Sequence, residues 1–335
     1  MCSVAIMRHD INSIWKNRLG IMMDYKNKSV LVTGATGLVG SCLTKKLVDM
    51  GANVTALVRD HVYNSELIRN GYYHKINRVK GDLKDFALME RLIGEHEIEY
   101  VFHLAAQTIV PIANRNPVST FETNIIGTSN LLEVCRRAPL VKRIIVASSD
   151  KAYGDNGKDA YTEDTPLRGE HPYDVSKSCQ DLISLTYNHS FGMSVAVARC
   201  GNIYGAGDLN WSRLIPGTIR RLLNKERPLV YGNGKMLRDY FYVDDCADSY
   251  LLLGASNEVG AFNFSGGEPK TTLEVISMIQ KVMGTHSPLD YIGSNNEIDS
   301  QWLDSTKAKE RLGFMPKHTL ETGLIETVKW YKDIL

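Results

Sequence analysis

The stretch VLVTGATGLVG, residues 30–40, decides the fold of this chain. Its first residues belong to an apolar run, which predicts a buried strand, and the amphipathic pattern of residues 41–50 predicts a helix directly after it. Between the two, Gly34, Gly37 and Gly40 follow the spacing G-x-x-G-x-x-G. Glycines at such a turn let backbone N–H groups and the N-terminus of the helix approach a pyrophosphate. The order of strand, glycine-rich turn and helix therefore predicts a dinucleotide-binding unit.

Apolar runs and amphipathic segments alternate along the first 200 residues. Such alternation predicts parallel strands joined by right-handed crossovers, with helices on both faces of one sheet. The expected fold class is therefore α/β, with a doubly wound parallel (Rossmann) sheet. The expected strands are residues 29–33, 53–58, 100–104, 143–148 and 194–198, and a long amphipathic segment covers residues 118–137.

The chain has no internal repeat and no Pro/Gly-rich linker, so a second lobe has to come from insertions after the later strands. Residues 201–242 and 263–315 are the expected pieces. We predict an N-terminal extension at residues 1–27 and a Rossmann domain, mainly residues 28–200, that binds NAD(P) and carries the catalytic residues. Residues 201–335 mainly form a smaller, substrate-binding lobe, with some segments that return to the Rossmann domain.

Composition narrows the class of protein. The 335 residues include 39 Lys+Arg and 38 Asp+Glu, a net charge of +1, so no overall field attracts nucleic acid or an anionic membrane. Six cysteines are scattered without a C-x-x-C pair, which argues against a metal site and a disulfide framework. Charged residues interrupt the N-terminal segment, and no apolar run approaches the length of a membrane span. We therefore expect a cytoplasmic protein that contacts neither nucleic acid nor membrane.

The residues after the second expected strand bear on the choice of dinucleotide. A carboxylate at the tip of this strand holds the ribose 2′-hydroxyl of NAD, whereas an arginine accommodates the 2′-phosphate of NADP. Counted from Gly34, the usual acidic position falls on Val58, and Arg59 follows it. This favours NADP, with NAD as the alternative because Asp60 can also reach a hydroxyl.

A second group of polar residues follows the expected strand at residues 143–148. Ser149 stands at its tip, and Tyr173 and Lys177 are four residues apart on a segment that Pro172 can begin as a helix, so both side chains share one face. An ammonium group beside a tyrosine lowers the pKa of the phenol from about 10, and a serine hydroxyl can position a substrate oxygen. The three residues together predict proton transfer at a substrate hydroxyl.

With these motifs the sequence resembles the extended short-chain dehydrogenase/reductases that epimerise or dehydrate nucleotide sugars. The resemblance covers about residues 28–333. It implies a tightly bound and recycled NAD(P), a nucleoside-diphosphate sugar as substrate, and a homodimer that pairs the helices near residues 118–137 and 173–188. Its further marks are GDL at 81–83, HLAAQ at 103–107, NIIGT at 124–128, GNIYG at 201–205 and RDYFYV at 238–243.

The resemblance also implies roles for individual residues. Asp82 would meet the adenine, Asn124 would support the active site, and Asn202 and Arg238 would hold the substrate diphosphate. The residues implied for the cofactor are Gly34, Thr36, Gly37, Leu38, Val39, Gly40, Arg59, Asp82, Leu83, Leu104, Ala105, Ala106, Tyr173 and Lys177. The residues implied for the substrate are Gln107, Asn124, Ser149, Asn202, Arg213 and Arg238.

Asp150 and Lys151 bear on which reaction the chain performs. In the family it resembles, 4-epimerases usually carry small residues after the catalytic Ser or Thr, whereas 4,6-dehydratases carry an Asp that protonates the departing 6-hydroxyl. Many dehydratases continue with a Glu that removes the C5 proton; here Lys151 takes that place, and Ser-Asp-Lys looks like CDP-glucose 4,6-dehydratase. A lysine acts as a base only if its pKa falls below the usual value of about 10.4. Stabilising an enolate and pairing with Asp150 are the alternatives for Lys151.

The resulting expectation is a nucleotide-sugar 4,6-dehydratase that converts an NDP-hexose, CDP-glucose-like, to an NDP-4-keto-6-deoxyhexose. The reaction oxidises C4, eliminates water across C5 and C6 and returns hydride to C6. A nucleotide-sugar 4-epimerase is the runner-up, and a non-catalytic dinucleotide-sensing protein is the alternative from another class. Val58-Arg59 resembles GDP-mannose 4,6-dehydratase, so the nucleotide and the hexose stay open. The expected catalytic residues are Ser149, Asp150, Lys151, Tyr173 and Lys177.

Overall fold

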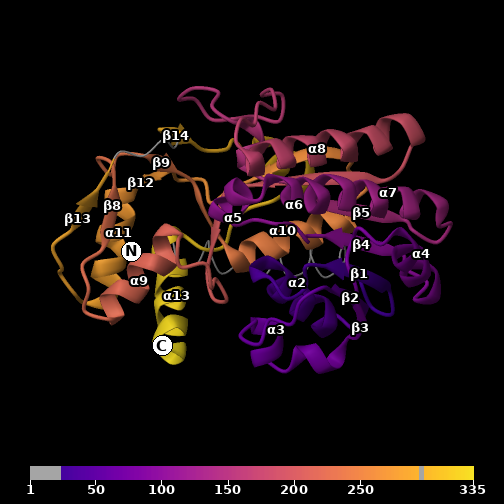
Figure 1. Ribbon diagram of the computed structural model, residues 1–335, viewed down its shortest axis with the longest axis horizontal. Coiled ribbons are helices and arrows are strands. Elements are labelled where there is room, and N and C mark those ends of the chain that lie inside the picture. The colour runs from indigo at the N-terminus through magenta and orange to yellow at the C-terminus, as the bar shows by residue number, and fades with distance from the viewer. Residues whose placement is uncertain (1–23, 294–297) are drawn as a thin grey trace, which may run out of the picture.

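The computed structural model describes residues 24–293 and 298–335, and its larger part is built on one sheet (Figure 1). The strands of this sheet are β1 (Ser29–Thr33), β2 (Asn53–Val58), β3 (Asn77–Lys80), β4 (Tyr100–His103), β5 (Arg143–Ala147), β6 (Val195–Cys200) and β11 (Gly260–Phe264). Their order is β11-β6-β5-β4-β1-β2-β3, and all neighbours are parallel. The strand order runs outward from β1 in both directions, so the predicted doubly wound fold is confirmed.

All five strands that the apolar runs predicted are present, but β3 and β11 were not predicted. β3 has the sequence NRVK and is mostly exposed at the edge of the sheet, so it carries almost no apolar signal. β11 is buried and pairs with β6, which places Asn263 and Phe264 in the Rossmann sheet rather than in the second lobe. Both strands are set by pairing with a neighbour and not by a local pattern.

Helices cover both faces of the sheet (Figure 1). The helices around it are α2 (Leu38–Asp49), α3 (Glu66–Arg69), η1 (Tyr72–Lys75), α4 (Phe86–Glu95), α5 (Val110–Arg115), α6 (Pro117–Phe121), the π-helix η2 (Glu122–Ile126), α7 (Gly127–Arg137), the 3₁₀-helix η3 (Asp150–Tyr153), α8 (Pro172–Phe191), α10 (Val243–Ala255) and α12 (Thr306–Leu312). Residues of α2 and α10 share one core with Val30 and Val32, whereas those of α4 and α7 share the other with Leu31. Side chains of β1 therefore alternate between the two layers, as a strand buried on both faces requires.

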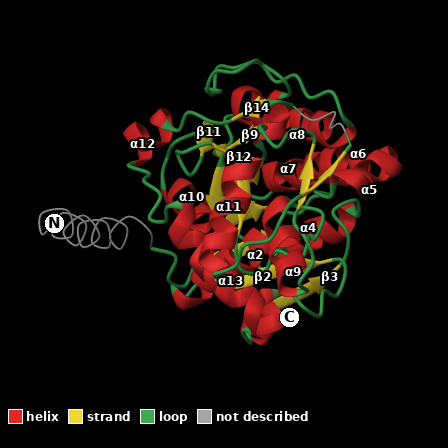
Figure 2. Cartoon of the chain, turned by 90° about the vertical axis from the view of Figure 1, so that its left-hand side faces the viewer, coloured by secondary structure: helices red, strands yellow, loops and turns green. Residues whose placement is uncertain are grey.

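A smaller lobe lies beside the sheet, at the left of Figure 1. Its core contains Ile219, Val275 and Leu324, one from each of its three helices, and these helices lie together on the side that faces the viewer in Figure 2. The elements of the lobe are α9 (Leu214–Leu223), α11 (Thr272–Met283), α13 (Leu320–Ile334), the pair β8 (Leu229–Tyr231) and β13 (Asp290–Ile292), and the three strands β9 (Leu237–Arg238), β12 (Lys270–Thr271) and β14 (Ser300–Gln301). β7 (Asn202–Tyr204) and β10 (Tyr240–Tyr242) form a separate parallel pair.

The described part of the expected N-terminal extension packs against the Rossmann core. Tyr25 is buried, its ring meets that of Tyr100 edge-on at 5.6 Å, and its hydroxyl donates to Leu251 O at 2.9 Å. Residues 1–23 of the extension lie outside the described residues. Among the described residues, no helix is both long and apolar enough to cross a membrane.

Candidate active site

The glycine-rich turn between β1 and α2 divides its three glycines between two tasks. Gly34 has φ +74°, and a Cβ there would lie 2.8 Å from Ala105 N, whereas a Cβ on Gly40 would lie 2.0 Å from Gly34 O. These two positions need glycine for the turn and for close packing. Gly37 is exposed at the N-cap of α2, and the nearest neighbour of a Cβ there would be Gly34 O at 3.3 Å. The backbone at Gly37 is therefore open on its outer side, which fits a pyrophosphate at the N-terminus of α2.

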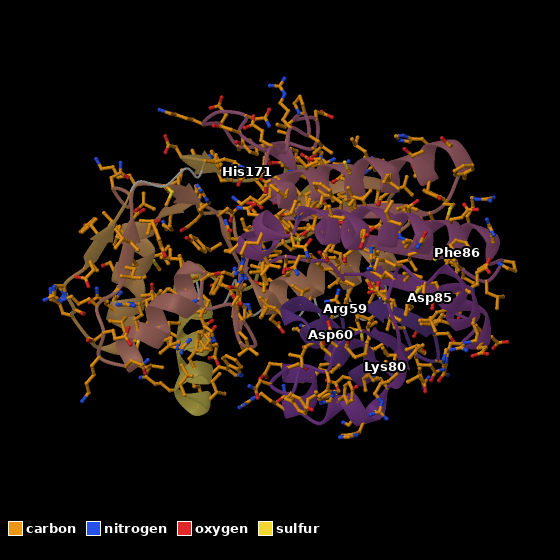
Figure 3. The ribbon with its side chains drawn as sticks, in the orientation of Figure 1. Arg59, Asp60, Lys80, Asp85, Phe86 and His171 are labelled. Carbon is orange, nitrogen blue, oxygen red and sulfur yellow. The ribbon has the colours of Figure 1, made fainter. Side chains whose placement is uncertain are left out.

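Two cations lie at the neighbouring ends of β2 and β3. Arg59 Nε contacts Asp60 Oδ2 at 2.7 Å, and both side chains are more than half exposed. Lys80 is also exposed, and its strand register places it opposite Val58, next to this pair (Figure 3). Asp82 follows β3, where its Oδ1 accepts from Lys84 N at 3.0 Å. The structure thus adds Lys80, which the sequence analysis did not select, to the edge where the adenosine half of a dinucleotide is expected.

Ser149 and Asp150 lie together at the carboxyl end of β5. The Ser149 hydroxyl donates to Asp150 Oδ1 at 3.0 Å and accepts from Lys151 N at 3.2 Å. α8 brings the phenol of Tyr173 to the same place, close enough for the Ser149 hydroxyl to lower its pKa. Asp150 is 2% exposed, and its Oδ2 has no hydrogen-bond partner among the described residues. A buried carboxylate oxygen without a partner lowers the stability of the folded protein, and such groups are typical of functional sites.

Tyr173 and Lys177 are both buried on one face of α8, as their spacing predicted. Lys177 Nζ donates to Ala147 O at 2.8 Å and to Gln180 Oε1 at 2.7 Å, and burial lowers the pKa of this lysine to about 8. Burial also raises the pKa of the Tyr173 phenol above its usual value, and the neighbouring Ser149 hydroxyl offsets this only in part. This differs from the expected lowering of the phenol pKa, because desolvation outweighs the nearby positive charge.

A hydrogen-bond chain that the sequence analysis did not predict connects Lys177 with β4. Gln180 Nε2 donates to Thr128 Oγ1 at 2.9 Å, and Thr128 donates its single proton to Asn124 O at 2.7 Å. His103 Nε2, 2.8 Å from Thr128 Oγ1, must therefore carry the proton of the ring and donate it. Burial lowers the pKa of His103 to about 3, so the ring is neutral. These hydrogen bonds hold the side chain of Gln180 in place and, through it, the Lys177 ammonium.

Asn124 lies in the π-helix η2, and its side chain orders the loop after β4. Its Oδ1 accepts from Gln107 N at 2.8 Å, and its Nδ2 donates to Gln107 O at 3.1 Å and to Ser176 Oγ at 2.9 Å. Both amide protons of Asn124 are therefore used within the protein. The residue therefore ties Gln107, in the loop after β4, to Ser176 of α8.

The smaller lobe contributes polar groups that the structure leaves without partners. Asn202 Nδ2 and Asp239 Oδ2 are buried, and neither has a hydrogen-bond partner among the described residues. Burial raises the pKa of Asp239 to about 6, and the charge of Asp150 adds to this effect. Arg213 forms an ion pair with Asp208 at 2.8 Å, and its charge lowers the pKa of the Tyr173 phenol. The two lobes therefore place their polar groups within electrostatic reach of each other.

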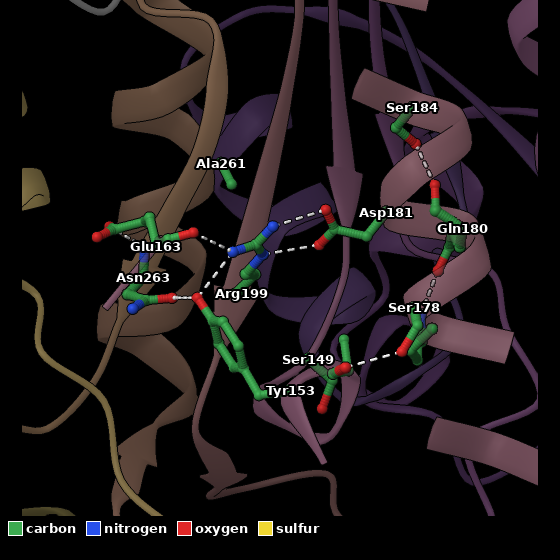
Figure 4. A network of polar contacts seen from close by, with 12 residues as sticks. Ser149, Tyr153, Glu163, Ser178, Gln180, Asp181, Ser184, Arg199, Ala261 and Asn263 are labelled. Atoms are coloured by element: carbon green, nitrogen blue, oxygen red, sulfur yellow. Dashed lines mark hydrogen bonds and ion pairs between the residues drawn. The ribbon is translucent and has the colours of Figure 1, made fainter. Parts of the chain in front are cut away.

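A buried ion pair anchors η3, the short helix that carries Asp150 (Figure 4). Arg199 Nε and Asp181 Oδ2 are 2.8 Å apart, and Arg199 Nη1 also donates to Tyr153 Oη at 2.8 Å. Tyr153 ends η3, and its hydroxyl donates to Asn263 Oδ1 at 2.7 Å. Sequence reasoning missed this network, because its members come from β6, β11, α8 and η3 and carry no local motif.

A Rossmann sheet with this glycine turn, and with a serine, a tyrosine and a lysine gathered at one edge, defines the class of short-chain dehydrogenase/reductases. Comparison with known proteins narrows the class to a family. The pattern of the family described as GDP-mannose 4,6 dehydratase matches residues 31–327, so this chain belongs to that family. The family membership expected from the motifs is therefore confirmed.

Named relatives cover nearly the whole chain. A dTDP-glucose 4,6-dehydratase of Xanthomonas campestris pv. campestris is 31% identical over 325 residues, which cover 90% of this chain and 92% of the relative. A CDP-glucose 4,6-dehydratase of Salmonella typhimurium is 30% identical over 330 residues, 92% of this chain and 91% of the relative. These similarities support a dehydratase over other members of the class.

Solved structures show the same architecture in two kinds of enzyme. A UDP-glucose 4-epimerase of Thermotoga maritima, solved with UDP-glucose, has a TM-score of 0.85 and 30% identity over 91% of this chain and 99% of that one. A dTDP-glucose 4,6-dehydratase of Streptomyces venezuelae, solved with NAD bound, has a TM-score of 0.83 and 27% identity over 91% of this chain and 97% of that one. Because both enzymes share the fold, the site has to distinguish between their reactions.

Proposed function

We propose that this protein is a nucleotide-sugar 4,6-dehydratase that converts an NDP-hexose to an NDP-4-keto-6-deoxyhexose. The observation that carries the proposal is Asp150: a buried carboxylate, hydrogen-bonded to Ser149, whose second oxygen has no partner among the described residues. An epimerase needs no acid at this position, whereas a dehydratase needs one to protonate the leaving hydroxyl. The named dehydratase relatives support the same interpretation.

The glycine turn and the ends of β2 and β3 would hold a nicotinamide dinucleotide. Gly34 and Gly40 shape the turn, and the open backbone at Gly37 would face the pyrophosphate at the N-terminus of α2. The chemistry that a bound nicotinamide would supply is a hydride acceptor for C4 of the sugar and a hydride donor for C6, with no net consumption of the cofactor. The NAD-bound relative supports the class of cofactor.

The protein's own groups would move the protons of the oxidation step. Tyr173 takes the proton of the sugar's 4-hydroxyl as its C–H bond breaks, and Ser149 aligns the oxygen. The phenol needs nearby positive charge to give up its own proton, because burial raises its pKa. Arg213 and the Lys177 ammonium, which Ala147 O and Gln180 Oε1 hold in place, are the groups that supply this charge.

Elimination would follow at C5 and C6. The new 4-ketone acidifies the C5 hydrogen; Lys151 in its neutral form takes this proton, and the C5–H electron pair forms the C5=C6 double bond. The C6–O bond breaks at the same time, and Asp150 in its acid form gives its proton to the leaving hydroxyl, which departs as water. Hydride addition at C6 then leaves an enolate, and protonated Lys151 would return its proton to C5, which resets the base. Proton exchange with solvent would reset Asp150 and Tyr173.

Mass spectrometry tests the proposed function. Purified protein is incubated with CDP-, GDP-, UDP- and dTDP-hexoses in the presence of NAD⁺ or NADP⁺. Loss of one water from one of these substrates is the expected result and identifies the nucleotide. An unchanged mass with a shifted chromatographic position indicates a 4-epimerase, the candidate that the Thermotoga structure favours. Dinucleotide binding with every sugar unchanged indicates a sensing protein.

We infer NADP rather than NAD as the preferred dinucleotide. Arg59 and Lys80 stand at the neighbouring ends of β2 and β3, near where a 2′-phosphate would bind, and a phosphate gains more from two cations than a hydroxyl does. Asp60 already pairs with Arg59, which reduces its availability for a ribose hydroxyl. Calorimetric titration with both dinucleotides tests this inference: tighter binding of NAD⁺ would contradict it.

We also infer a homodimer in the cytoplasm. Val118, Ile126 and Leu182 are large apolar residues on α6, η2 and α8 that are all at least half exposed. These elements pack against each other and present one helical face to solvent. Such a face is typical of a subunit interface. The cysteines in the described part of the chain are free thiols, which supports a reducing compartment.

A further inference from the structure

Gln301 is a fully buried residue that enters the site from the far end of the chain. Its exposed fraction is 0%, and its side chain contacts the segment that follows Ser149. The Gln301 Nε2 group donates to Asp150 O at 2.9 Å and to Gly154 O at 3.4 Å, while Gln301 Oε1 accepts from Lys151 Nζ. This orientation of the amide is the one that chemistry allows, because carbonyls only accept and an ammonium only donates. One side chain thus binds both ends of η3 and the ammonium between them.

Backbone contacts on both sides hold Gln301 in place. Within the three-stranded sheet, β14 pairs with β9, and Gln301 lies opposite Arg238. Directly after Gln301, Tyr161 N donates to Trp302 O at 2.9 Å and Asp304 N donates to Tyr161 O at 2.9 Å. The residue expected to hold the substrate diphosphate and the residue that binds Lys151 are therefore neighbours in one ladder. A buried side chain on a strand that is paired with a neighbour is well suited to orient another group.

The acceptor that Gln301 offers to Lys151 is neutral. A carboxylate in this place would stabilise the charged ammonium and oppose its use as a base, as the charges of Asp244 and Asp248 raise the pKa of Lys46. An amide oxygen fixes the direction of the Nζ group without adding a charge. At the same time the amide nitrogen fixes the backbone of Asp150, so the proposed base and acid of the elimination share one support.

We propose that Gln301 is a positioning residue for water elimination. Its side chain holds Lys151 and the Asp150 backbone at a fixed place relative to β9, the strand that carries Arg238. The proposal rests on the proposed dehydratase function and deepens it. It assigns to the C-terminal lobe a part in the chemistry of the Rossmann domain, in addition to substrate binding. Gln301 itself touches no reacting atom in this account and acts through its two partners.

The test compares Gln301→Met with the wild type on the NDP-hexose that the wild type dehydrates. Methionine has a similar volume and lacks both hydrogen-bonding groups. We expect kcat to fall about tenfold to a hundredfold, since a small misplacement of catalytic groups costs this much, and KM to change less than about twofold. Reduced nicotinamide should accumulate, because C4 oxidation continues while elimination slows, and the isotope effect of a C5-deuterated substrate should rise.

A spectroscopic readout is independent of turnover. In protein with ¹⁵N-labelled lysine, the Nζ signal of Lys151 is assigned by its absence from Lys151→Met. Exchange of its protons with water should be at least about tenfold faster in Gln301→Met, because a hydrogen bond to a charged group is lost. The loss of Gln301 should slow elimination by a smaller factor in the Lys151→Met background than in the wild type, since part of its effect acts through Lys151.

Gln280→Met is the matched control. Gln280 is a buried glutamine of the same lobe, and its amide contacts the backbone of Ser287. This variant should lose stability without accumulation of reduced nicotinamide.

Unchanged kcat in Gln301→Met, or a slowdown of all steps with a raised KM, would overturn the positioning role and leave the dehydratase function intact. A wild type that removes water from no NDP-hexose overturns both. If Gln301→Met does not fold, Gln301→Asn, which draws the amide back by one methylene, is judged by the same readouts.

Discussion

Asp150 is the residue on which the choice between two reactions depends. The fold is shared with a 4-epimerase at a TM-score of 0.85, so the architecture does not distinguish them. In the proposed function Asp150 distinguishes them, because a buried acid beside the Ser149 hydroxyl would have no task in a 4-epimerase. The tyrosine and the lysine of α8 would serve both reactions equally.

Replacing Asp150 by Asn tests this distinction with little change of shape. The amide has no acidic proton to give to the leaving 6-hydroxyl, so water loss should slow about a hundredfold to a thousandfold. Oxidation at C4 should continue, and reduced nicotinamide should appear in the absorbance spectrum. Mass spectrometry follows water loss in the same samples. An Asp150→Asn variant that dehydrates at the wild-type rate would refute the role of Asp150 as acid.

Lys177 makes the stability of the protein depend on pH. Its pKa is about 8 in the folded protein, against 10.5 for an unperturbed lysine, because burial disfavours the charged form. Between these two values the unfolded chain binds more protons than the folded one, so the free energy of unfolding rises with pH. Relative to Lys177→Met, the wild type should gain about 3 kcal/mol between pH 8 and pH 10.5. Urea denaturation of both proteins at these two pH values measures the difference, and parallel curves would contradict the prediction.

At the scale of elements, the turn from β1 to α2 separates packing from ligand binding. Gly40→Ala would place a Cβ 2.0 Å from Gly34 O and should cost at least about 2 kcal/mol of stability. Gly37→Ala would place a Cβ 3.3 Å from Gly34 O, a tight contact that a shift of a few tenths of an ångström relieves, so it should cost less stability than Gly40→Ala. The same methyl should weaken dinucleotide binding at least about tenfold, because it occupies the approach to the backbone N–H groups. Thermal unfolding and calorimetric titration of both variants decide the matter, and undiminished binding by Gly37→Ala would place the pyrophosphate elsewhere.

The network around Arg199 shows how distant elements hold η3 in place (Figure 4). Asp181→Asn would leave the buried Arg199 guanidinium without its carboxylate, which should lower the free energy of unfolding by about 3 kcal/mol. Asp49→Asn is a control, because Asp49 pairs with Lys45 on the surface of α2 and should matter little. Urea denaturation measures both. Equal stability of the two variants would show that the buried pair does not anchor this region.

At the scale of the whole molecule, the exposed helical face formed by α6, η2 and α8 predicts association. Leu182 is 55% exposed on α8, and a charge there would be buried in the proposed interface. Leu182→Glu should therefore give a monomer, because an unpaired buried charge is costly. Ile325→Glu, at a comparably exposed apolar position on α13 of the smaller lobe, should leave the dimer intact. Light scattering coupled to size-exclusion chromatography gives both masses, and a dimeric Leu182→Glu protein would exclude this face.

The sequence was most informative where a local rule governs the structure. Five buried strands follow from apolar runs, and α8 follows from Pro172 and the spacing of Tyr173 and Lys177. β3 was missed because an exposed edge strand carries little apolar signal. β11 was missed because its place in the sheet depends on pairing with β6, which the sequence of β11 does not reveal. Secondary structure is thus predictable where the apolar periodicity of a segment decides it. It is less predictable where pairing with a neighbouring strand decides it.

The proposed catalytic residues were selected from motifs, whereas their environment could not be predicted in this way. Ser149, Asp150, Tyr173 and Lys177 stand in short patterns, so the sequence by itself determined which groups the site contains. Burial depends on packing across the whole chain, and this packing, not the Tyr-Lys spacing, sets the direction in which the pKa values of Tyr173 and Lys177 shift.

The same distinction applies to the supports of the site. The sequence alone determined a doubly wound sheet with a glycine turn, because backbone preference and apolar periodicity act over a few residues. Only the tertiary structure brought Gln301 to Lys151, 150 positions apart, and Arg199 to Asp181 and Tyr153. Buried polar groups must find partners wherever folding places them, and that requirement has no signature in local sequence.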